Sequence, residues 1–389
     1  MIKTIKVMLC PNNKQITKLF QSAGVSRFAY NWALEKEIEN YKNGGKFIND
    51  CTLRREFTVL KQKEEYQWLN DYSNNIPKQA IKDCCKAFQS FFKGTSKHPK
   101  FKSRHHSKPS FYLDTDKIEF NGTHVKLEKL TLSKKRSKQK FNWIRLSEPN
   151  RIPLNSKYSN PRVTFDGLNW FLSVGIECDD NNNLPQNDGI GIDLGIKDLA
   201  ICSDGRVYKN INKTKKIRRL KKKKRRLQRK ISRKYLKNKK GDSYCKTCNI
   251  IKSEKQLLKI THKLTNIRHN HIHQMTSKIM NREPKFITIE DLNITGIMKN
   301  KHLAKAIQEQ CLYEVRRQLE YKSKCNNIVL RIADRFYPSS KMCSCCGNIK
   351  KDLKLKDRIY RCEICGNTID RDYQASINLK YCTDYKCIT

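Results

Sequence analysis

Acidic residues are scarce in this 389-residue sequence: 37 Asp and Glu stand against 82 Lys and Arg, which gives a formal net charge of +45. Such an excess of positive charge argues against an ordinary enzyme of small metabolites. It indicates a polyanionic partner, most commonly a nucleic acid. Hydrophobic residues make up 37% of the chain, which is enough for cores, and the length predicts two or three domains of about 150 residues each.

Long apolar runs are also missing. No segment approaches the roughly 18 apolar residues of a membrane-spanning helix, and the first residues (MIKTIK) lack the apolar stretch of a secretory signal. We therefore expect no membrane partner and a cytoplasmic location, associated with the nucleoid if the source is prokaryotic. In that reducing compartment, clustered members of the 17 cysteines indicate metal binding rather than a disulfide framework.

The spacing of apolar residues divides the sequence into three stretches. Helical periodicity predicts helices over 15–41, with a possible break at Gly24, then over 52–68 and 77–92. From about 94 to 180, alternation of apolar and polar residues predicts an antiparallel barrel or sheet. The acidic, Asn-rich residues 179–188 that follow are typical of a linker.

From Gly189 onward, strands and helices alternate. Strands are expected at 189–195, 199–202 and 206–209, then a helix at 213–240, a helix at 253–282, a strand at 286–290, a helix at 303–324, a strand at 328–332 and a helix from 370. In the helix at 213–240, 18 of 28 residues are Lys or Arg and none is acidic. The order of these elements resembles that of the ribonuclease-H-like (RuvC-type) nuclease fold.

Four cysteines form two pairs with the spacing of zinc ligands. Cys343 and Cys346 are followed, after fifteen residues, by Cys362 and Cys365. Two C-x2-C pairs can complete a tetrahedral set of thiolates, which is typical of structural zinc. A third pair, Cys245 and Cys248, has no matching pair nearby, so we interpret it as free thiols, with a second metal site as the alternative.

Three widely separated acids fall on predicted strands and at a helix start: Asp193, Glu290 and Asp372. Hard oxygen ligands of this kind can hold two Mg²⁺ ions about 4 Å apart for phosphodiester hydrolysis. Carboxylates in an apolar context are costly unless something pairs them. Spacing alone leaves open the alternative that these acids are helix caps or surface residues.

Seven fragments in order give the chain a resemblance to a known family. The fragments are residues 27–34, 99–103, 191–197 (GIDLGIK), 289–293 (IEDLN), 317–322, 338–341 (PSSK) and 370–372 (DRD). The sequence resembles TnpB (OrfB), the transposon-encoded RNA-guided nuclease family, and its relatives, the compact type V CRISPR effectors. It departs from the family pattern at Gln374 and Ser376, where Asn and Ala are usual.

The resemblance implies an α+β multidomain fold. It predicts an oligonucleotide-binding-like wedge domain (1–10 and 94–180) with a helical recognition insert (11–93), a linker (181–188), and a RuvC nuclease domain (189–337 and 369–389) that carries a zinc ribbon (338–368). It also assigns catalysis and two Mg²⁺ ions to Asp193, Glu290 and Asp372, with Asp370 as the rival for the third position, and one structural Zn²⁺ to the four cysteines.

The implied function is RNA-guided cutting of double-stranded DNA by a protein encoded in a transposable element. Guide RNA or heteroduplex is expected to contact the basic helix, represented by Arg219, Lys222, Arg225, Arg226 and Arg229. By resemblance, a DNA motif flanking the target is expected to face Lys78, Gln79 and Lys82. The alternatives are a DNA transposase that acts without guide RNA and a non-catalytic zinc-ribbon protein that binds nucleic acid.

Overall fold

A computed structural model of the chain describes residues 2–133, 135–154, 156–177, 185–354 and 357–388. The chain divides into two compact units, Met1–Asp179 and Asp180–Thr389, and each is described by itself. The predicted linker and the end of the predicted wedge domain overlap residues 178–184, which lie outside the described residues. No helix in the described part of the chain combines the length and hydrophobicity that crossing a membrane requires.

The first unit contains a seven-stranded antiparallel sheet in the order β2-β6-β7-β1-β5-β4-β3. Strand β1 lies between β7 and β5, so the first residues of the chain pair with segments more than a hundred residues away. The strands are β1 (Ile2–Cys10), β2 (Ser110–Tyr112), β3 (Glu119–Phe120), β4 (His124–Lys126), β5 (Trp143–Leu146), β6 (Tyr158–Phe165) and β7 (Trp170–Glu177).

Helices fill the sequence between β1 and β2 and share one hydrophobic core with the sheet. These are α1 (Asn13–Lys42), α2 (Asp50–Leu60), the 3₁₀ helix η1 (Glu64–Asp71) and α3 (Asn75–Phe92); the short helices η2 (Thr115–Lys117), α4 (Arg136–Gln139) and η3 (Lys140–Asn142) lie farther along. The predicted break at Gly24 is wrong: α1 is continuous, because its neighbours Ala23 and Val25 are buried in the core and packing outweighs the weak helix propensity of one glycine.

The second unit contains a six-stranded mixed sheet in the order β10-β9-β8-β13-β14-β17. Strands β8, β13 and β14 are parallel, and β9, β10 and β17 run antiparallel to their neighbours. The strands are β8 (Ile190–Leu194), β9 (Asp198–Cys202), β10 (Val207–Lys209), β13 (Phe286–Glu290), β14 (Val329–Ala333) and β17 (Tyr385–Ile388). The sequence did not predict β17, a short and mostly exposed edge strand.

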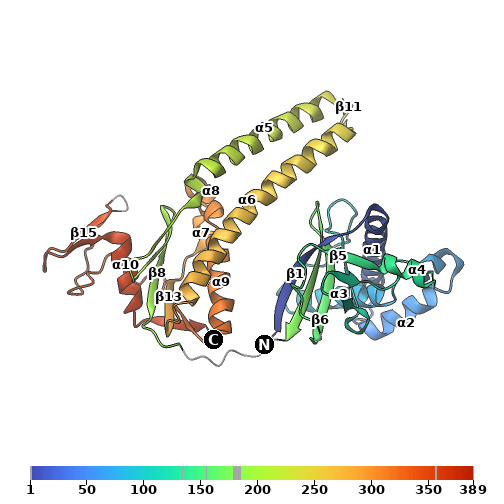
Figure 1. Cartoon of the computed structure of the whole chain (residues 1–389), viewed down its shortest axis with the longest axis horizontal. Coiled ribbons are helices and arrows are strands. Elements are labelled where there is room, and N and C mark those ends of the chain that lie inside the picture. The colour runs from blue at the N-terminus through green and yellow to red at the C-terminus, as the bar shows by residue number, and fades with distance from the viewer. Residues whose placement is uncertain (1, 134, 155, 178–184, 355–356, 389) are drawn as a thin grey trace. The chain divides into compact units, whose positions relative to one another are not determined.

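Helices α5 (Lys215–Lys237) and α6 (Cys248–Met280) form a long hairpin that extends away from the sheet of the second unit (Figure 1). A small two-stranded ribbon, β11 (Lys239–Lys240) and β12 (Ser243–Tyr244), joins them at the tip. The remaining elements are η4 (Ile211–Lys213), α7 (Ile294–Ile297), α8 (Lys301–Gln310), α9 (Leu312–Cys325), β15 (Ile359–Arg361), β16 (Thr368–Asp370) and α10 (Arg371–Lys380). The helix predicted over 303–324 is in fact two, because Cys311 takes a left-handed conformation (φ +55°) between α8 and α9.

The last helix, α10, packs directly against β8, β9 and β13. Its backbone approaches β8 so closely that any side chain at Gly191 would collide with the carbonyl oxygen of Ser376 and the backbone of Lys380. Ala375 and Leu379 on α10 are buried. The glycine in the GIDLGIK fragment is therefore a packing requirement of the sheet and helix that carry the candidate site.

We predict that Gly191→Ala destabilises the second unit by about 1–3 kcal/mol, because backbone atoms must move to admit the methyl group. Thermal unfolding measures this change. Gly24→Ala is the matched control: a methyl group there meets nothing within 4 Å, so helix propensity should stabilise the protein by about 0.5–1 kcal/mol. Equal stability of Gly191→Ala and the wild type would contradict the close packing of α10 on β8.

Candidate functional site

Two of the three predicted acids lie side by side on neighbouring strands. Strands β8 and β13 are parallel, with Ile192 opposite Ile289. Asp193 and Glu290 each come one residue later, so they lie at the same level of the sheet. Because side chains alternate between the two faces of a sheet, both carboxylates point to the face opposite the buried isoleucines.

The third acid, Asp372, comes from the first turn of α10. Asp193 and Asp372 both line a pocket of about 230 Å³ whose wall also includes Lys197 and Arg358. The structure thus brings together three acids that are separated by up to 179 residues in the sequence (372 − 193).

The three carboxylates affect one another electrostatically. Burial, together with the charges of Glu290 and Asp372, raises the pKa of Asp193 to about 8. A cation bound between crowded carboxyl groups favours their charged form. The donor set consists of hard oxygen ligands, which suit Mg²⁺. Among the described residues, the oxygens of the three acids do not all lie within 4.8 Å of one another, so the set fits ions held between pairs of carboxylates better than one ion held by all three.

Neighbouring acids already have other partners. Asp370 is the N-cap of α10: its Oδ1 accepts hydrogen bonds from the backbone N–H groups of Asp372 and Tyr373, each at 3.0 Å. Asp291 forms ion pairs with Arg316 at 2.9 Å and Arg335 at 3.0 Å. Asp370 and Asp291 are close in sequence to Asp372 and Glu290, but these contacts give them structural roles outside the site.

Two further contacts position the site, and neither side chain was assigned a role from the sequence. The Ser339 hydroxyl donates a hydrogen bond to Glu290 Oε1. Arg358 Nη1 lies 3.5 Å from Asp372 Oδ2, and the Arg358 carbonyl accepts a hydrogen bond from the backbone N–H of Arg371 at 2.9 Å. One arginine among 82 basic residues cannot be singled out by sequence, because only the fold places it beside an acid.

The two departures from the family pattern lie inside α10. Gln374 and Ser376 are fully buried. The Ser376 hydroxyl donates to the carbonyl of Tyr373 at 2.7 Å, so its polarity is satisfied within the helix. The amide group of Gln374 has no hydrogen-bond partner among the described residues. Burying an unpaired amide lowers the stability of the fold, and the packing of α10 on the sheet has to offset this loss.

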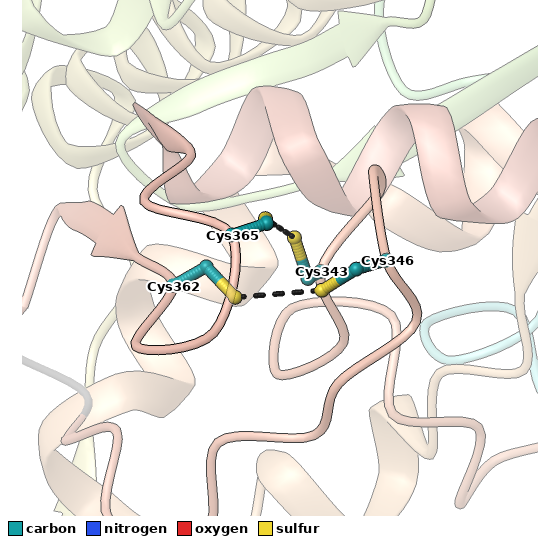
Figure 2. Close-up of side chains that lie close together, drawn as sticks. All are labelled: Cys343, Cys346, Cys362 and Cys365. Atoms are coloured by element: carbon teal, nitrogen blue, oxygen red, sulfur yellow. Dashed lines mark hydrogen bonds between the residues drawn. The ribbon is translucent and has the colours of Figure 1, made fainter.

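The four predicted cysteine ligands converge (Figure 2). The sulfur atoms of Cys343, Cys346, Cys362 and Cys365 all lie within 4.8 Å of one another, with 3.6 Å between Cys343 and Cys365 and 3.5 Å between Cys346 and Cys362. Four thiolates at a Zn–S distance of about 2.3 Å form a tetrahedron with edges of about 3.8 Å. The cluster therefore fits one zinc ion, and Cys345 is not part of it.

Each cysteine pair lies in a tight turn that directs backbone N–H groups to sulfur. Gly347 and Gly366 follow the pairs and have positive φ angles of +74° and +72°, which glycine adopts without strain. Hydrogen bonds from the backbone N–H groups of Cys365 and Ile364 lower the pKa of Cys362 to about 6. The backbone hydrogen bonds of the turns favour the thiolate form, which binds metal, whereas neighbouring sulfurs raise the pKa values of Cys346 and Cys365.

The predicted nucleic-acid contacts lie on two helices. Five of them are exposed on α5: Arg219, Lys222, Arg225, Arg226 and Arg229. The other three lie on α3 in the first unit, where Lys78 and Lys82 are exposed and the Gln79 amide donates to Asp83 at 2.8 Å. The narrow apolar seam of α5 packs on α6 through Ile217, Ile260 and Leu264, which leaves the basic face of α5 to solvent.

Comparisons with known proteins agree with the resemblance. Over 97% of its length, the chain is 29% identical to a "Putative RNA-guided DNA endonuclease" from Streptomyces pristinaespiralis, of which it covers 88%. It is 27% identical, again over 97% of its length, to the "Putative RNA-guided DNA endonuclease InsQ" of Escherichia coli (strain K12), of which it covers 91%. Residues 173–301 match an OrfB model described as "Probable transposase", and 313–379 match a model described as "Cas12f1-like, TNB domain".

The resemblance to the TnpB (OrfB) family is confirmed. The fold of this TnpB-like chain is also similar to that of a protein solved by cryo-electron microscopy in a Cas12f1–sgRNA–target DNA complex, with a TM-score of 0.60 at 15% identity over 96% of this chain and 83% of that one. This likeness confirms the α+β fold class. A third model, described as "Helix-turn-helix domain", matches residues 1–46; in this TnpB-like chain they form β1 and the single helix α1.

We predict that Asp193→Asn stabilises the protein in the absence of added divalent cations. The folded-state pKa of Asp193 is about 8 and that of an unfolded Asp is about 4, so the wild type loses stability as the pH rises between these values. At pH 8 the variant should gain about 1 kcal/mol or more, which for a domain of this size raises Tm by roughly 2–4 °C; near pH 4 the difference should vanish.

Thermal unfolding at several pH values, with and without Mg²⁺, measures the effect. Mg²⁺ should raise the Tm of the wild type and leave that of Asp193→Asn unchanged. Asp291→Asn is the matched control with the opposite sign, because the hydrogen bond from Arg316 lowers the pKa of Asp291, and the variant should lose stability above about pH 4. A wild type as stable as Asp193→Asn at pH 8 would refute the electrostatic crowding.

Proposed function

We propose that this protein is an RNA-guided DNA endonuclease of a transposable element, and that its second unit is a RuvC-type nuclease domain. The observation that carries the proposal is the convergence of Asp193, Glu290 and Asp372 from β8, β13 and α10. The sheet order, with β8 in the middle and β13 and β14 parallel to it, is the arrangement expected for this nuclease fold. The names of the relatives support a nuclease that uses guide RNA.

In this proposal, Asp193, Glu290 and Asp372 hold two Mg²⁺ ions. Bound there, the ions would supply activation of a water molecule and stabilisation of the leaving oxygen of the phosphodiester. The hydrogen bond from Ser339 fixes the rotamer of Glu290. The guanidinium of Arg358, beside Asp372, is placed to contact a phosphate oxygen and offset its negative charge.

A structural zinc ion in the ribbon positions this part of the site. Strands β15 and β16 pair with Ile359 opposite Asp370, so the ribbon ends directly in the N-cap of α10. We propose that Zn²⁺ bound to Cys343, Cys346, Cys362 and Cys365 fixes both Arg358 and the first turn of α10. It takes no part in chemistry, because four thiolates leave no open coordination position.

We propose that nucleic acid binds the basic face of α5 and the surface of α3. Guide RNA or heteroduplex would lie along Arg219, Lys222, Arg225, Arg226 and Arg229, and target DNA along Lys78, Gln79 and Lys82. The antiparallel sheet of the first unit would serve as the wedge domain and α1–α3 as its recognition insert. Such a protein would act in the cytoplasm, on the nucleoid of a prokaryotic cell.

We predict that Asp372→Asn abolishes Mg²⁺-dependent DNA cleavage, because an amide binds Mg²⁺ more weakly than a carboxylate. Asp370→Asn is the matched control two residues away: asparagine caps helices as well as aspartate does, so cleavage should be retained. The assay uses the purified protein with its copurifying RNA and DNA that matches this RNA. Loss of cleavage in Asp370→Asn alone would reverse the assignment, and joining of DNA ends by RNA-free protein would favour the transposase alternative.

We also predict that replacing Arg225, Arg226 and Arg229 together with Gln weakens binding of a short double-stranded RNA and flattens its salt dependence. Each lost phosphate contact reduces the slope of log K against log[salt] by about 0.7–0.9. The slope for the triple variant should therefore be smaller by about 2–3. Fluorescence anisotropy at several salt concentrations measures the slope. The same three positions changed to Lys keep the charge and should keep the slope; an unchanged slope in the Gln variant would exclude this face from the interface.

A further inference from the structure

The tip of the α5–α6 hairpin carries the cysteine pair that the proposed function leaves unused. Strands β11 and β12 are joined by the two-residue turn Gly241-Asp242, with Gly241 at φ +57°. Cys245 directly follows β12, and Cys248 is the first residue of α6. Both side chains are exposed, at the end of the hairpin away from the sheet of the second unit (Figure 1).

Several contacts hold the tip in one conformation. The rings of Tyr235 and Tyr244 meet edge to face with centroids 6.0 Å apart. Glu254 on α6 accepts a hydrogen bond from the Tyr235 hydroxyl and pairs with Lys246, each at 2.7 Å. The backbone N–H of Cys245 donates to the carbonyl of Asn238 at 2.9 Å. The cysteines therefore lie on an ordered tip, and little entropy is lost when they bind a ligand.

The pair has half of the ligands that a structural zinc ion needs. Its C-x2-C spacing is the same as that of Cys343 and Cys346 in the ribbon, where both sulfurs reach one cluster. Tetrahedral zinc takes four ligands. Across the described ranges, the four ribbon cysteines are the only group of three or more potential ligands that lie within 4.8 Å of one another, so Cys245 and Cys248 have no third ligand among the described residues.

We propose that a second copy of this chain supplies the missing half: one Zn²⁺ ion joins two hairpin tips through Cys245 and Cys248 of each copy. Such a contact is isologous, because both copies present the same pair to the same ion. Four thiols release four protons and bind one Zn²⁺ ion, which leaves a complex with a formal charge of 2 − 4 = −2.

Charge and shape are compatible with this bridge. Lys239, Lys240 and Lys246 are exposed at each tip; they repel one another in a bare dimer but face a doubly negative zinc–thiolate centre when the ion is present. Helix α5 has 23 residues and is about 35 Å long. This length separates the bridge from the sheet and from the candidate active site of the same unit.

The test measures zinc content and molar mass of the full-length protein. Nucleic acid is removed in high salt, a reducing agent prevents disulfides, and the protein is loaded with Zn²⁺ and freed of excess ion. The wild type should hold about 1.5 zinc ions per chain, one in each ribbon and one shared, and should be a dimer by light scattering. Cys245→Ser with Cys248→Ser should reduce these values to about one zinc ion per chain and a monomer.

The matched control changes two other exposed cysteines, Cys10→Ser with Cys51→Ser, and should keep both the zinc content and the mass of the wild type. The proposal is overturned if the zinc content or the mass of the Cys245/Cys248 variant equals that of the wild type. A monomeric wild type with two zinc ions per chain also overturns it. The proposal does not rest on the nuclease activity, because neither readout involves cleavage.

Discussion

The candidate active site depends on the direct contact between the backbone of α10 and β8. Gly191 allows this contact because it has no side chain to collide with Ser376 and Lys380. Asp193 lies two residues farther along β8, and Asp372 lies one turn before Ser376 on α10. Residues at such short separations from a fixed crossing point have little freedom to move apart, so this packing contact brings two of the three acids to one pocket.

The same contact brings carboxylates close together without enough basic side chains nearby to balance their negative charge. In a protein with a net charge of +45, the acids of the site have few basic partners: Arg358 is 3.5 Å from Asp372, while Asp193 remains crowded by carboxylates with its pKa raised to about 8. Lysines on distant parts of the surface do not relieve this crowding, because water and salt screen their charges. Divalent cations bound between the acids would relieve it, which is why the electrostatics support a metal-dependent site.

The sequence predicted the parts of this site that depend on local pattern and missed those that depend on packing. Apolar runs located β8 and β13, and the C-x2-C spacing located the ribbon cysteines that the structure brings together. The break at Cys311 had no local signal, because cysteine is not among the residue types that favour the left-handed conformation it takes between α8 and α9. Arg358 shows the same limit, because only the fold places it beside an acid, whereas the N-cap role of Asp370 agrees with the preference of aspartate for that position.

The three cysteine pairs show most clearly what spacing can and cannot determine. C-x2-C spacing shows that two thiolates can reach one ion, and this holds equally for Cys245 and Cys248 and for the two ribbon pairs. Whether a pair forms a closed site depends on what the fold places opposite it. In the ribbon, a second turn of the same chain supplies the other two sulfurs, whereas the tip of a long helical hairpin faces solvent. Because a tetrahedral ion needs ligands on all sides, a pair in that position can complete its site only with a group from another molecule.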